Sequence, residues 1–281
     1  MGVEPVDRAM IDETLIARLT AEVAVAAAAT LEIARTGVNV RLKADRSPLT
    51  DADERSQTIL LAATARLMPG VPVVSEEMAS RPSRLGGVFV LIDPLDGTKE
   101  YVAGSSEYTV NLAIVQNGEP VVGIVAVPAE GLIYRGVVGY GAERLSMSAD
   151  GALAASSARS IEVRAPPQGS LVAAVSRSHL DAATVALLDR LGVTRRVACG
   201  SALKFCRVAE GIADIYPRLA TTCEWDVAAG HALVVAAGGA VTLPEGGGLR
   251  YGDAASDFRV PAFIAWGDRA GVVGAAGLAT R

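Results

Sequence analysis

A chain of 281 residues with a formal net charge of −5 and a pI near 5.2 is long enough for two packed domains. Its acidity argues against a nucleic-acid polymer as partner, because proteins that bind a phosphate backbone need clustered Lys and Arg. Its three cysteines are an odd number without C-x-x-C spacing, which argues against a disulfide framework or a zinc site and favours the reducing cytosol.

The first 36 residues predict a long helix and no membrane segment. Residues 1–14 lack an apolar signal core, and residues 23–30 are apolar over too short a run to span a bilayer, with Glu22 and Glu32 close on either side. Leu, Ile and Val recur three or four residues apart in residues 15–36, as in an amphipathic helix. We therefore expect a cytoplasmic protein without a transmembrane segment, and contact with the inner face of the cell membrane stays open.

A polar loop, residues 43–53, leads into a second predicted helix. Thr50 is a suitable N-cap, and the helix runs over residues 51–67 until a Pro-Gly pair stops it. Asp53 has capping-box spacing from Thr50, so its simplest role is to accept a hydrogen bond from an orphan amide. Asp51 lies in the same turn, and the sequence does not decide which of the two Asp residues acts in chemistry.

The stretch VFVLIDPLDGTKEY, residues 88–101, places Asp93 and Asp96 directly after an apolar run that predicts a buried strand. Pro94 lacks an N–H and is expected to end the strand pairing. Gly97 then permits a tight turn, after which backbone amides begin a helix. The result is a polar turn at the edge of an apolar sheet.

Asp and Gly after a strand are also ordinary turn residues, so this motif alone fits a plain turn. Two further acidic sites in the chain favour a functional role over a plain turn. Glu76 and Glu77 follow the apolar run 71–74, and Trp225-Asp226 begins an apolar segment late in the chain. Neighbouring carboxylates repel unless a cation lies between them, and free amides at a helix start attract phosphate. The set predicts a metal-assisted phosphate site.

The remainder of the first half predicts an antiparallel sheet. Asn117-Gly118 between two apolar segments is a type I′ hairpin signal. Residues 139–164 lack clear periodicity and predict an irregular connection. The β-rich segments are residues 108–116, 120–127 and 131–138. We expect residues 1–160 to form an α+β domain that contains two helices, this sheet and most of the acidic site residues.

The second half alternates strand and helix patterns, which predicts an α/β domain over residues 161–281. The expected strands are residues 171–175, 195–198, 214–216 and 263–266, and the expected helices are residues 180–191, 202–210 and 225–237.

The Glu76-Glu77 pair, D-P-L-D-G-T and W-D-V-A-A resemble the signatures of the inositol monophosphatase superfamily. Within it, the flanks DGTKEY, GSALKFC and EWDVAAGHA are most similar to the CysQ-type 3′(2′),5′-bisphosphate nucleotidases. The resemblance covers residues 43–260 and implies a layered αβαβα sandwich. It also implies a lithium-sensitive, Mg²⁺-dependent phosphomonoesterase of sulfur metabolism that converts adenosine 3′,5′-bisphosphate (PAP) to AMP and phosphate, with its sulfated precursor PAPS as a further substrate.

The resemblance assigns roles to residues of the central motifs. Asp53 and Thr98 would orient and deprotonate the attacking water, and the amides of Gly97 and Thr98 would hold the phosphoryl oxygens. Glu77 would support the metal ligands from behind. Two or three Mg²⁺ ions would bind at Glu76, Asp93, the Leu95 carbonyl, Asp96 and Asp226. From spacing alone, Asp226 also fits an N-cap, and Trp225 fits a packing anchor.

Substrate contacts implied by the resemblance lie in the second half, at His179, Gly200-Ser201, Lys204 and Arg218. The alternative for Lys204 and Arg218 is solvated surface charge, and for His179 a surface residue beside a capped helix. Because inositol monophosphatases generally lack the Lys and Arg pair, we favour a nucleotide bisphosphate as the small-molecule partner of a monomer or homodimer.

Two rival functions follow from the same residues. An inositol monophosphatase or fructose-1,6-bisphosphatase would share the metal ligands and differ in the second-half contacts. A non-catalytic sensor is disfavoured because Asp53, Thr98 and the acidic residues are all present.

Overall fold

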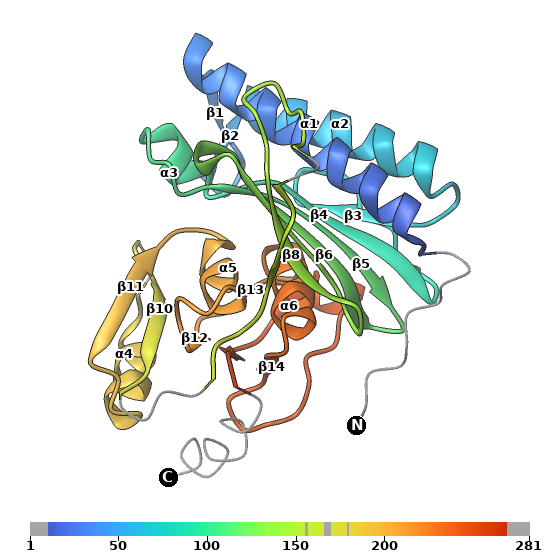
Figure 1. The fold of residues 1–281 in the computed structure, drawn as a ribbon. Coiled ribbons are helices and arrows are strands. Elements are labelled where there is room, and N and C mark those ends of the chain that lie inside the picture. Colours follow the sequence, from blue (N-terminus) through green and yellow to red (C-terminus); the bar gives the residue numbers. More distant parts are fainter. Residues whose placement is uncertain (1–10, 155–156, 166–169, 179, 269–281) are drawn as a thin grey trace.

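The computed structural model describes residues 11–154, 157–165, 170–178 and 180–268. Two helices, α1 (Glu13–Thr36) and α2 (Asp51–Leu67), pack side by side and form the first layer (Figure 1). Both were predicted, and Thr50 caps α2 in a capping box with Asp53. The window of α1 that is apolar and long enough to cross a membrane is 50% buried inside the fold, as expected of a core helix.

A seven-stranded sheet forms the second layer, in the order β3-β4-β5-β6-β7-β8-β9. Strand β3 is parallel to β4, and all other neighbours are antiparallel. Asn117 and Gly118 have positive φ values in the β5–β6 turn, which confirms the predicted hairpin. The strands are β3 (Val73–Ser75), β4 (Val88–Asp96), β5 (Thr109–Gln116), β6 (Glu119–Val127), β7 (Leu132–Val137), β8 (Gly141–Ser146) and β9 (Arg159–Ile161).

Two expectations about this sheet were wrong. Residues 139–164 are not only an irregular connection, because β8 and β9 extend the sheet by pairing with β7 and with each other. Pro94 does not end β4 either. The strand continues to Asp96, with its register to β5 shifted between Asp93 and Asp96, so the proline lies where the pairing is irregular and its missing N–H costs no ladder bond.

Strands β4, β5 and β6 are buried on both faces, which explains why β4 and β5 read as continuous apolar runs. Val90, Ile92 and Leu112 pack against α1 and α2, whereas Leu91 and Ala113 face the opposite way. Because side chains alternate along a strand, the apolar run of β4 supports the helices on one side and a third layer on the other.

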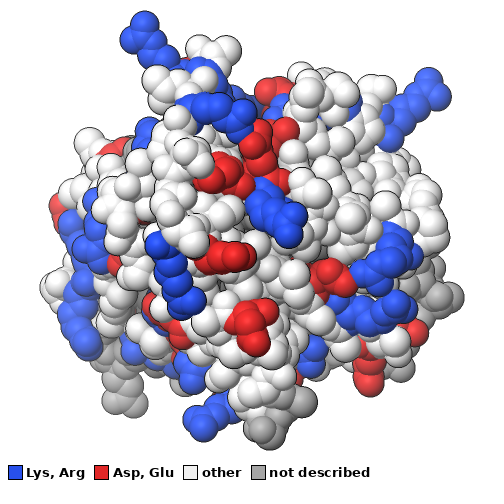
Figure 2. All heavy atoms as spheres, turned by 90° about the horizontal axis from the view of Figure 1, so that it is seen from above, with Lys and Arg blue, Asp and Glu red and all other residues white. Residues whose placement is uncertain are grey.

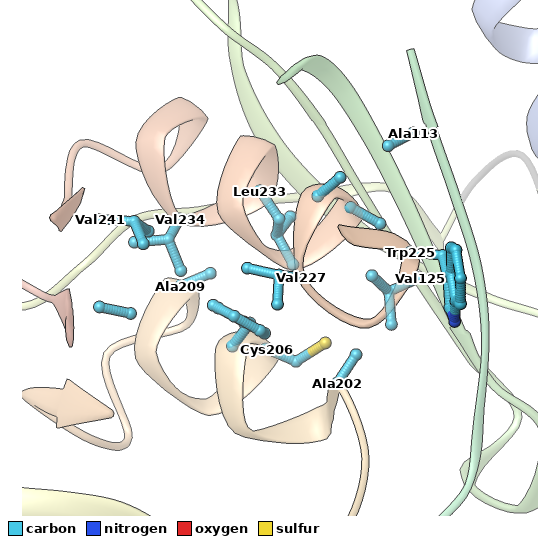
Figure 3. Packing of buried hydrophobic residues seen from close by; sticks show 14 of the residues in the cluster. Ala113, Val125, Ala202, Cys206, Ala209, Trp225, Val227, Leu233, Val234 and Val241 are labelled. Carbon is cyan, nitrogen blue, oxygen red and sulfur yellow. The ribbon is translucent and has the colours of Figure 1, made fainter. Parts of the chain in front are cut away.

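The third layer consists of α5 (Leu203–Ala209) and α6 (Glu224–Ala236). Figure 3 shows α6 between α5 and the strands that carry Ala113 and Val125. Close contact requires Gly123 on β6, because a Cβ there would lie 2.0 Å from the Ala229 carbonyl oxygen of α6. The glycine therefore sets the distance between α6 and the sheet.

A five-stranded sheet in the order β11-β10-β12-β16-β14 is the fourth layer, and α4 (Ala182–Arg190) is the fifth. Leu187 and Leu188 of α4 pack against Val175 and Ile264 of this sheet. These elements confirm the predicted second-half pattern, to which the structure adds β14. The strands are β10 (Val172–Ser176), β11 (Arg195–Cys199), β12 (Ile215–Arg218), β14 (Ala240–Thr242) and β16 (Phe263–Trp266).

Short elements complete the described fold and several lie at the site. They are β1 (Val40–Leu42), β2 (Pro48–Thr50), α3 (Thr98–Val102), η1 (Pro128–Glu130), β13 (Thr222–Cys223), η3 (Ala254–Ser256) and β15 (Arg259–Val260). The predicted αβαβα sandwich is confirmed. One apolar cluster includes Val125 and Phe205 from both predicted halves, and the boundary near residue 160 stays a prediction.

Charges are mixed on the face that is seen from above the first layer. Figure 2 shows Lys and Arg interspersed with Asp and Glu there, without a continuous basic stripe.

Candidate metal and phosphate site

Three acidic side chains meet where β3, β4 and α6 end or begin. Glu76 follows β3, Asp93 lies near the end of β4, and Asp226 lies in the first turn of α6. The backbone N–H of Glu76 donates to the Ile92 carbonyl at 3.2 Å, which places Glu76 beside Asp93. One carboxylate oxygen from each of the three residues lies within 4.8 Å of the others.

Asp93 has the most constrained carboxylate of the three. It is 1% exposed, and its Oδ1 accepts a hydrogen bond from the Leu95 N–H at 3.1 Å. Its Oδ2 is buried and has no hydrogen-bond partner among the described residues. Burial raises the pKa of Asp93 well above its usual value, and the nearby charges of Glu76 and Asp96 raise it further.

Lys43 supplies positive charge beside Glu76 and Glu77. Its Nζ lies 3.0 Å from Glu76 Oε1 and 2.5 Å from Glu77 Oε1. Burial lowers the pKa of Lys43, but the two glutamates more than offset it and the net shift is upward. Burial raises the pKa of Glu76 to about 7 despite the opposing effect of Lys43, and burial also raises the pKa of Glu77.

Asp96 lies on the other side of the site. Burial and the charge of Asp226 raise its pKa to about 7, although Lys204 and Arg218 oppose the shift. The carboxyl groups of the site thus outnumber the cationic side chains beside them. Oxygen donors of this kind, with one buried oxygen unpaired, fit a hard divalent cation.

Asp53 and Thr98 are in contact across two elements, because α2 starts close to α3. The Thr98 hydroxyl lies 3.2 Å from both Asp53 Oδ1 and the Leu95 carbonyl. Asp53 Oδ2 accepts from the Thr50 N–H at 2.8 Å, so the capping-box interpretation is confirmed. The same carboxylate therefore caps a helix and faces the site. Burial raises the pKa of Asp53.

Asp51, whose role was left open, turns away from these groups. Its carboxylate accepts from the N–H and the side-chain amide of Asn39 at 3.2 and 2.9 Å. This contact favours Asp53 over Asp51 as the residue of the site.

A cavity of about 220 Å³ opens beside these carboxylates. Several walls were not foreseen, namely Ser47 and Pro48 of the loop before α2 and Thr222 before α6. The predicted site residues that line it are Glu76, Asp96, Gly97, Thr98, Gly200, Ser201, Lys204, Arg218 and Asp226.

Gly97 brings the two halves together at this cavity. Its φ of 92° and ψ of 39° are left-handed, as glycine readily allows. A Cβ at Gly97 would lie 2.3 Å from the Ser201 hydroxyl oxygen. The predicted tight turn is thus present and leaves room for the turn before α5.

Lys204 is not a surface residue, so the alternative of solvated charge was wrong for it. Its side chain is 3% exposed, and Nζ donates to the carbonyls of Ser201 at 2.6 Å and Cys199 at 3.5 Å. The ammonium also lies 5.3 Å from the ring centre of Tyr216. The carbonyls of the turn hold it while it lines the cavity.

Arg218, at the end of β12, is partly buried and lines the same cavity. Burial lowers its pKa, but the influence of Tyr216 and Asp226 gives a net rise. Its Nε is buried without a hydrogen-bond partner among the described residues. His179 lies outside the described residues.

Around Asp226 the structure corrects one interpretation and confirms another. Asp226 is not the N-cap of α6, because the helix begins at Glu224 and Asp226 Oδ2 accepts from the Cys223 N–H at 3.1 Å and from the Thr222 hydroxyl. Trp225 is a packing anchor, 5% exposed, and the Arg81 guanidinium lies 4.5 Å from its ring centre.

Comparison with known proteins agrees with this geometry. The model of the inositol monophosphatase family matches residues 11–267. The 3′(2′),5′-bisphosphate nucleotidase CysQ of Salmonella typhimurium is 39% identical over 74% of this chain and 81% of its own length. The Escherichia coli CysQ is 38% identical over 76% and 83%.

Solved structures show the same architecture. The crystal structure of CysQ from Bacteroides thetaiotaomicron has a TM-score of 0.76 at 33% identity and covers 92% of this chain and 99% of its own. An inositol monophosphatase from Anabaena has a TM-score of 0.73 at 23% identity over 95% and 94%, a likeness of fold. From its sequence and its structure, the chain belongs to the inositol monophosphatase family.

Proposed function

We propose that this protein is a Mg²⁺-dependent 3′(2′),5′-bisphosphate nucleotidase that removes the 3′-phosphate of PAP and leaves AMP. The identity of more than a third with CysQ nucleotidases along most of the chain supports this activity. PAPS, which carries the same 3′-phosphate, is the second expected substrate.

One observation carries the proposal: a single cavity is lined both by carboxylates and by two cationic side chains, the buried Lys204 and the partly buried Arg218. Glu76, Asp96 and Asp226 are called the acidic wall below, and Lys204 and Arg218 the cationic wall; all five line the cavity. A phosphate ester with one phosphate on metal needs only the first wall. A second phosphate matches the second wall by charge and hydrogen bonding.

Glu76, Asp93, Asp96, Asp226 and the Leu95 carbonyl would hold the cations. Bound Mg²⁺ lowers the pKa of water and stabilises the leaving oxygen of an in-line displacement. Glu77 would keep Glu76 and Lys43 in place through its hydrogen bond to Lys43 Nζ. Whether two or three ions bind stays a prediction.

Asp53 and Thr98 would handle the proton of the attacking water. The Thr98 hydroxyl can donate to Asp53 and accept from water, and the raised pKa of Asp53 brings that carboxylate closer to the range of a general base. Gly97 and Thr98 line the cavity, and their backbone amides would hold phosphoryl oxygens.

The test is phosphate release from a substrate panel in Mg²⁺. PAP, PAPS, inositol monophosphate and fructose 1,6-bisphosphate are compared by kcat/KM, with 3′-AMP as the nucleotide that lacks the 5′-phosphate. We expect PAP to be best and 3′-AMP to be weaker by roughly tenfold to hundredfold, the effect of losing a charge-assisted phosphate contact. Equal efficiency on inositol monophosphate and PAP would overturn the proposal.

Lys204→Ala and Arg218→Ala give the matched check on the cationic wall. Each variant should raise the KM for PAP by roughly tenfold to hundredfold and change inositol monophosphate hydrolysis less. If both substrates lost activity equally, the two cations would serve the common chemistry or the fold, and a general sugar-phosphate phosphatase would be the better assignment.

A further inference from the structure

Glu107, in the segment between α3 and β5, joins three separate parts of the chain. Its carboxylate accepts two hydrogen bonds from Arg177, from Nε to Oε2 at 2.8 Å and from Nη2 to Oε1 at 2.7 Å. Oε2 also accepts from the Gly200 N–H at 3.0 Å. Arg177 follows β10 and Gly200 follows β11, two neighbouring strands of the five-stranded sheet. The Glu107 carboxylate therefore joins the ends of these two strands to the first half of the chain.

The backbone at residue 107 contacts the same turn. The Ser201 hydroxyl lies 3.0 Å from the Glu107 carbonyl and 2.8 Å from the Asp96 carbonyl. Ser201 has a φ of 51°, a left-handed conformation that is rare for a residue with a side chain. A Cβ at Gly200 would lie 2.7 Å from the Glu107 carbonyl oxygen. The turn is therefore closely fitted against residue 107.

The turn in question also holds the buried ammonium of Lys204, through the carbonyls of Ser201 and Cys199. A continuous path of contacts thus runs from Arg177 through Glu107 and the turn to Lys204. Glu107 itself is not among the residues that line the cavity, so it has no direct contact with a ligand there.

We propose that Glu107 is a positioning residue for substrate specificity: it fixes residues 199–202 so that the Lys204 ammonium faces the second phosphate of a nucleotide bisphosphate. This inference rests on the proposed function. The Glu107 carboxylate suits this role because both of its oxygens accept hydrogen bonds. Each oxygen accepts from one nitrogen of Arg177, and Oε2 also accepts from the Gly200 amide.

The alternative is that Glu107 only stabilises the fold, in which case its loss would act on every substrate alike. A comparison of PAP with 3′-AMP distinguishes the positioning role from a purely structural role, because only PAP has a 5′-phosphate. In the isosteric variant Glu107→Gln we expect KM for PAP to rise roughly tenfold, with kcat and the KM for 3′-AMP changed less than about twofold. In a Lys204→Ala background the same substitution should have no further effect on PAP.

The exposed ion pair between Asp189 and Arg196, at 3.0 Å, provides the control. Asp189→Asn removes a similar charge at a residue that does not line the cavity, and it should leave kcat and KM for both substrates unchanged. Should Glu107→Gln fail to fold, Arg177→Met tests the same bridge and should raise the KM for PAP in the same direction. An equal loss on both substrates, or additive effects with Lys204→Ala, would overturn the inference.

A second measurement does not depend on the substrate. The chain has only three lysines, Lys43, Lys99 and Lys204. Amine labelling followed by mass spectrometry should show slow modification of Lys204 in the wild type and at least about tenfold faster modification in Glu107→Gln, with exposed Lys99 as the internal reference. If Lys204 were labelled faster in Glu107→Gln but the wild type showed no preference for PAP, the proposed function would be refuted. If the labelling of Lys204 were unchanged in Glu107→Gln, the positioning role would be refuted.

Discussion

Asp93 has a buried carboxylate oxygen without a hydrogen-bond partner among the described residues, and this affects the stability of the fold. One of its oxygens is bonded to the Leu95 N–H and the other has no partner in the described part of the chain, and its pKa is raised by burial. Because burial in the folded state favours the protonated form, Asp93 lowers the stability of the metal-free protein at pH values above the usual pKa of an aspartate. A bound cation would stabilise the ionised carboxylate and so offset this loss of stability.

Asp93→Asn should therefore separate stability from turnover. We expect phosphate release in Mg²⁺ to fall below detection, while the melting temperature in EDTA stays equal or rises because a buried charge is gone. Activity assays and thermal scans on the same preparation measure both. Glu77→Gln, which keeps all predicted ligands, should lose less activity, and near-normal turnover of Asp93→Asn would contradict the metal site.

His231 gives a pH prediction that is independent of the site. It is buried, its Nδ1 lies 2.9 Å from the Tyr251 hydroxyl, and burial lowers its pKa to about 3 from 6.5. Above pH 6.5 neither the folded nor the unfolded chain protonates this ring. Between pH 6.5 and 3 only the unfolded chain does, so stability is lost as pH falls.

The contribution of His231 to the loss between pH 7 and pH 5 is about 2 kcal/mol. Denaturant unfolding at the two pH values should show this loss in wild type and a loss smaller by about that amount in His231→Gln, which retains hydrogen-bonding capacity toward Tyr251. The same pH dependence in both proteins would show that the ring is solvated or protonated in the fold.

At the scale of elements, the distance between α6 and the seven-stranded sheet depends on Gly123. Gly123→Ala would place a methyl group against the Ala229 carbonyl, and backbone cannot move aside as a side chain can. We expect a loss of roughly 1–3 kcal/mol in unfolding free energy and weaker divalent-cation binding, since α6 carries Asp226. Chemical denaturation and calorimetric titration measure the two effects.

Gly248→Ala is the matched control for that substitution. A Cβ at Gly248 meets nothing within 4 Å. The control should leave both quantities unchanged, and if it lost as much as Gly123→Ala, the cause would be glycine removal in general and not the close approach of α6.

Elements with strong periodicity were predictable, and those held by their neighbours were not. Helices α1 and α2 and strands β4 to β7 carry their own apolar pattern, and their predictions were confirmed except for the end of β4. Strand β8, GAERLS, has polar residues at half its positions and becomes a strand because β7 offers an unpaired edge. Pairing of that kind depends on tertiary structure and leaves little trace in a local sequence.

The same distinction holds for the site. Glu76, Asp93 and Asp226 were found because each follows or begins a recognisable apolar segment. Lys43 was missed because its partners lie 33 and 34 residues away in a different loop. The burial of Lys204 was missed because it depends on carbonyls of a left-handed turn, which a reading of charge and periodicity does not reveal.

For the whole molecule, the acidic cluster draws on both predicted halves, since Glu76 and Asp93 come from the first and Asp226 from the second. A cation bound there stabilises only the assembled fold. At one hundred times its dissociation constant, Mg²⁺ should add about 2.7 kcal/mol, which raises the melting temperature by about 5–10 °C. A thermal scan with and without EDTA measures the shift, and Asp226→Asn should abolish it.

Calcium should stabilise the fold without supporting turnover, because it takes a larger and looser ligand shell than Mg²⁺. We expect a comparable thermal shift, phosphate release near background in Ca²⁺ alone, and inhibition when Ca²⁺ or lithium is added to the Mg²⁺ enzyme. Full turnover with Ca²⁺ as the sole divalent ion would count against the proposed site. The control is the melting temperature of Asp226→Asn with a lanthanide ion or Ca²⁺ added. A rise of that temperature in the variant would reveal cation binding elsewhere on the protein.

The acidic and cationic groups of the cavity are carried by different elements. Asp93 lies on β4 and Glu76 directly after β3, whereas Lys204 lies on the short helix α5 and Arg218 at the end of β12. Helix α5 is buried almost throughout, so most of its residues are constrained by packing. Exchange of the two cationic side chains alone is therefore the smallest change expected to alter which phosphate ester is preferred while every carboxylate of the cation site is kept.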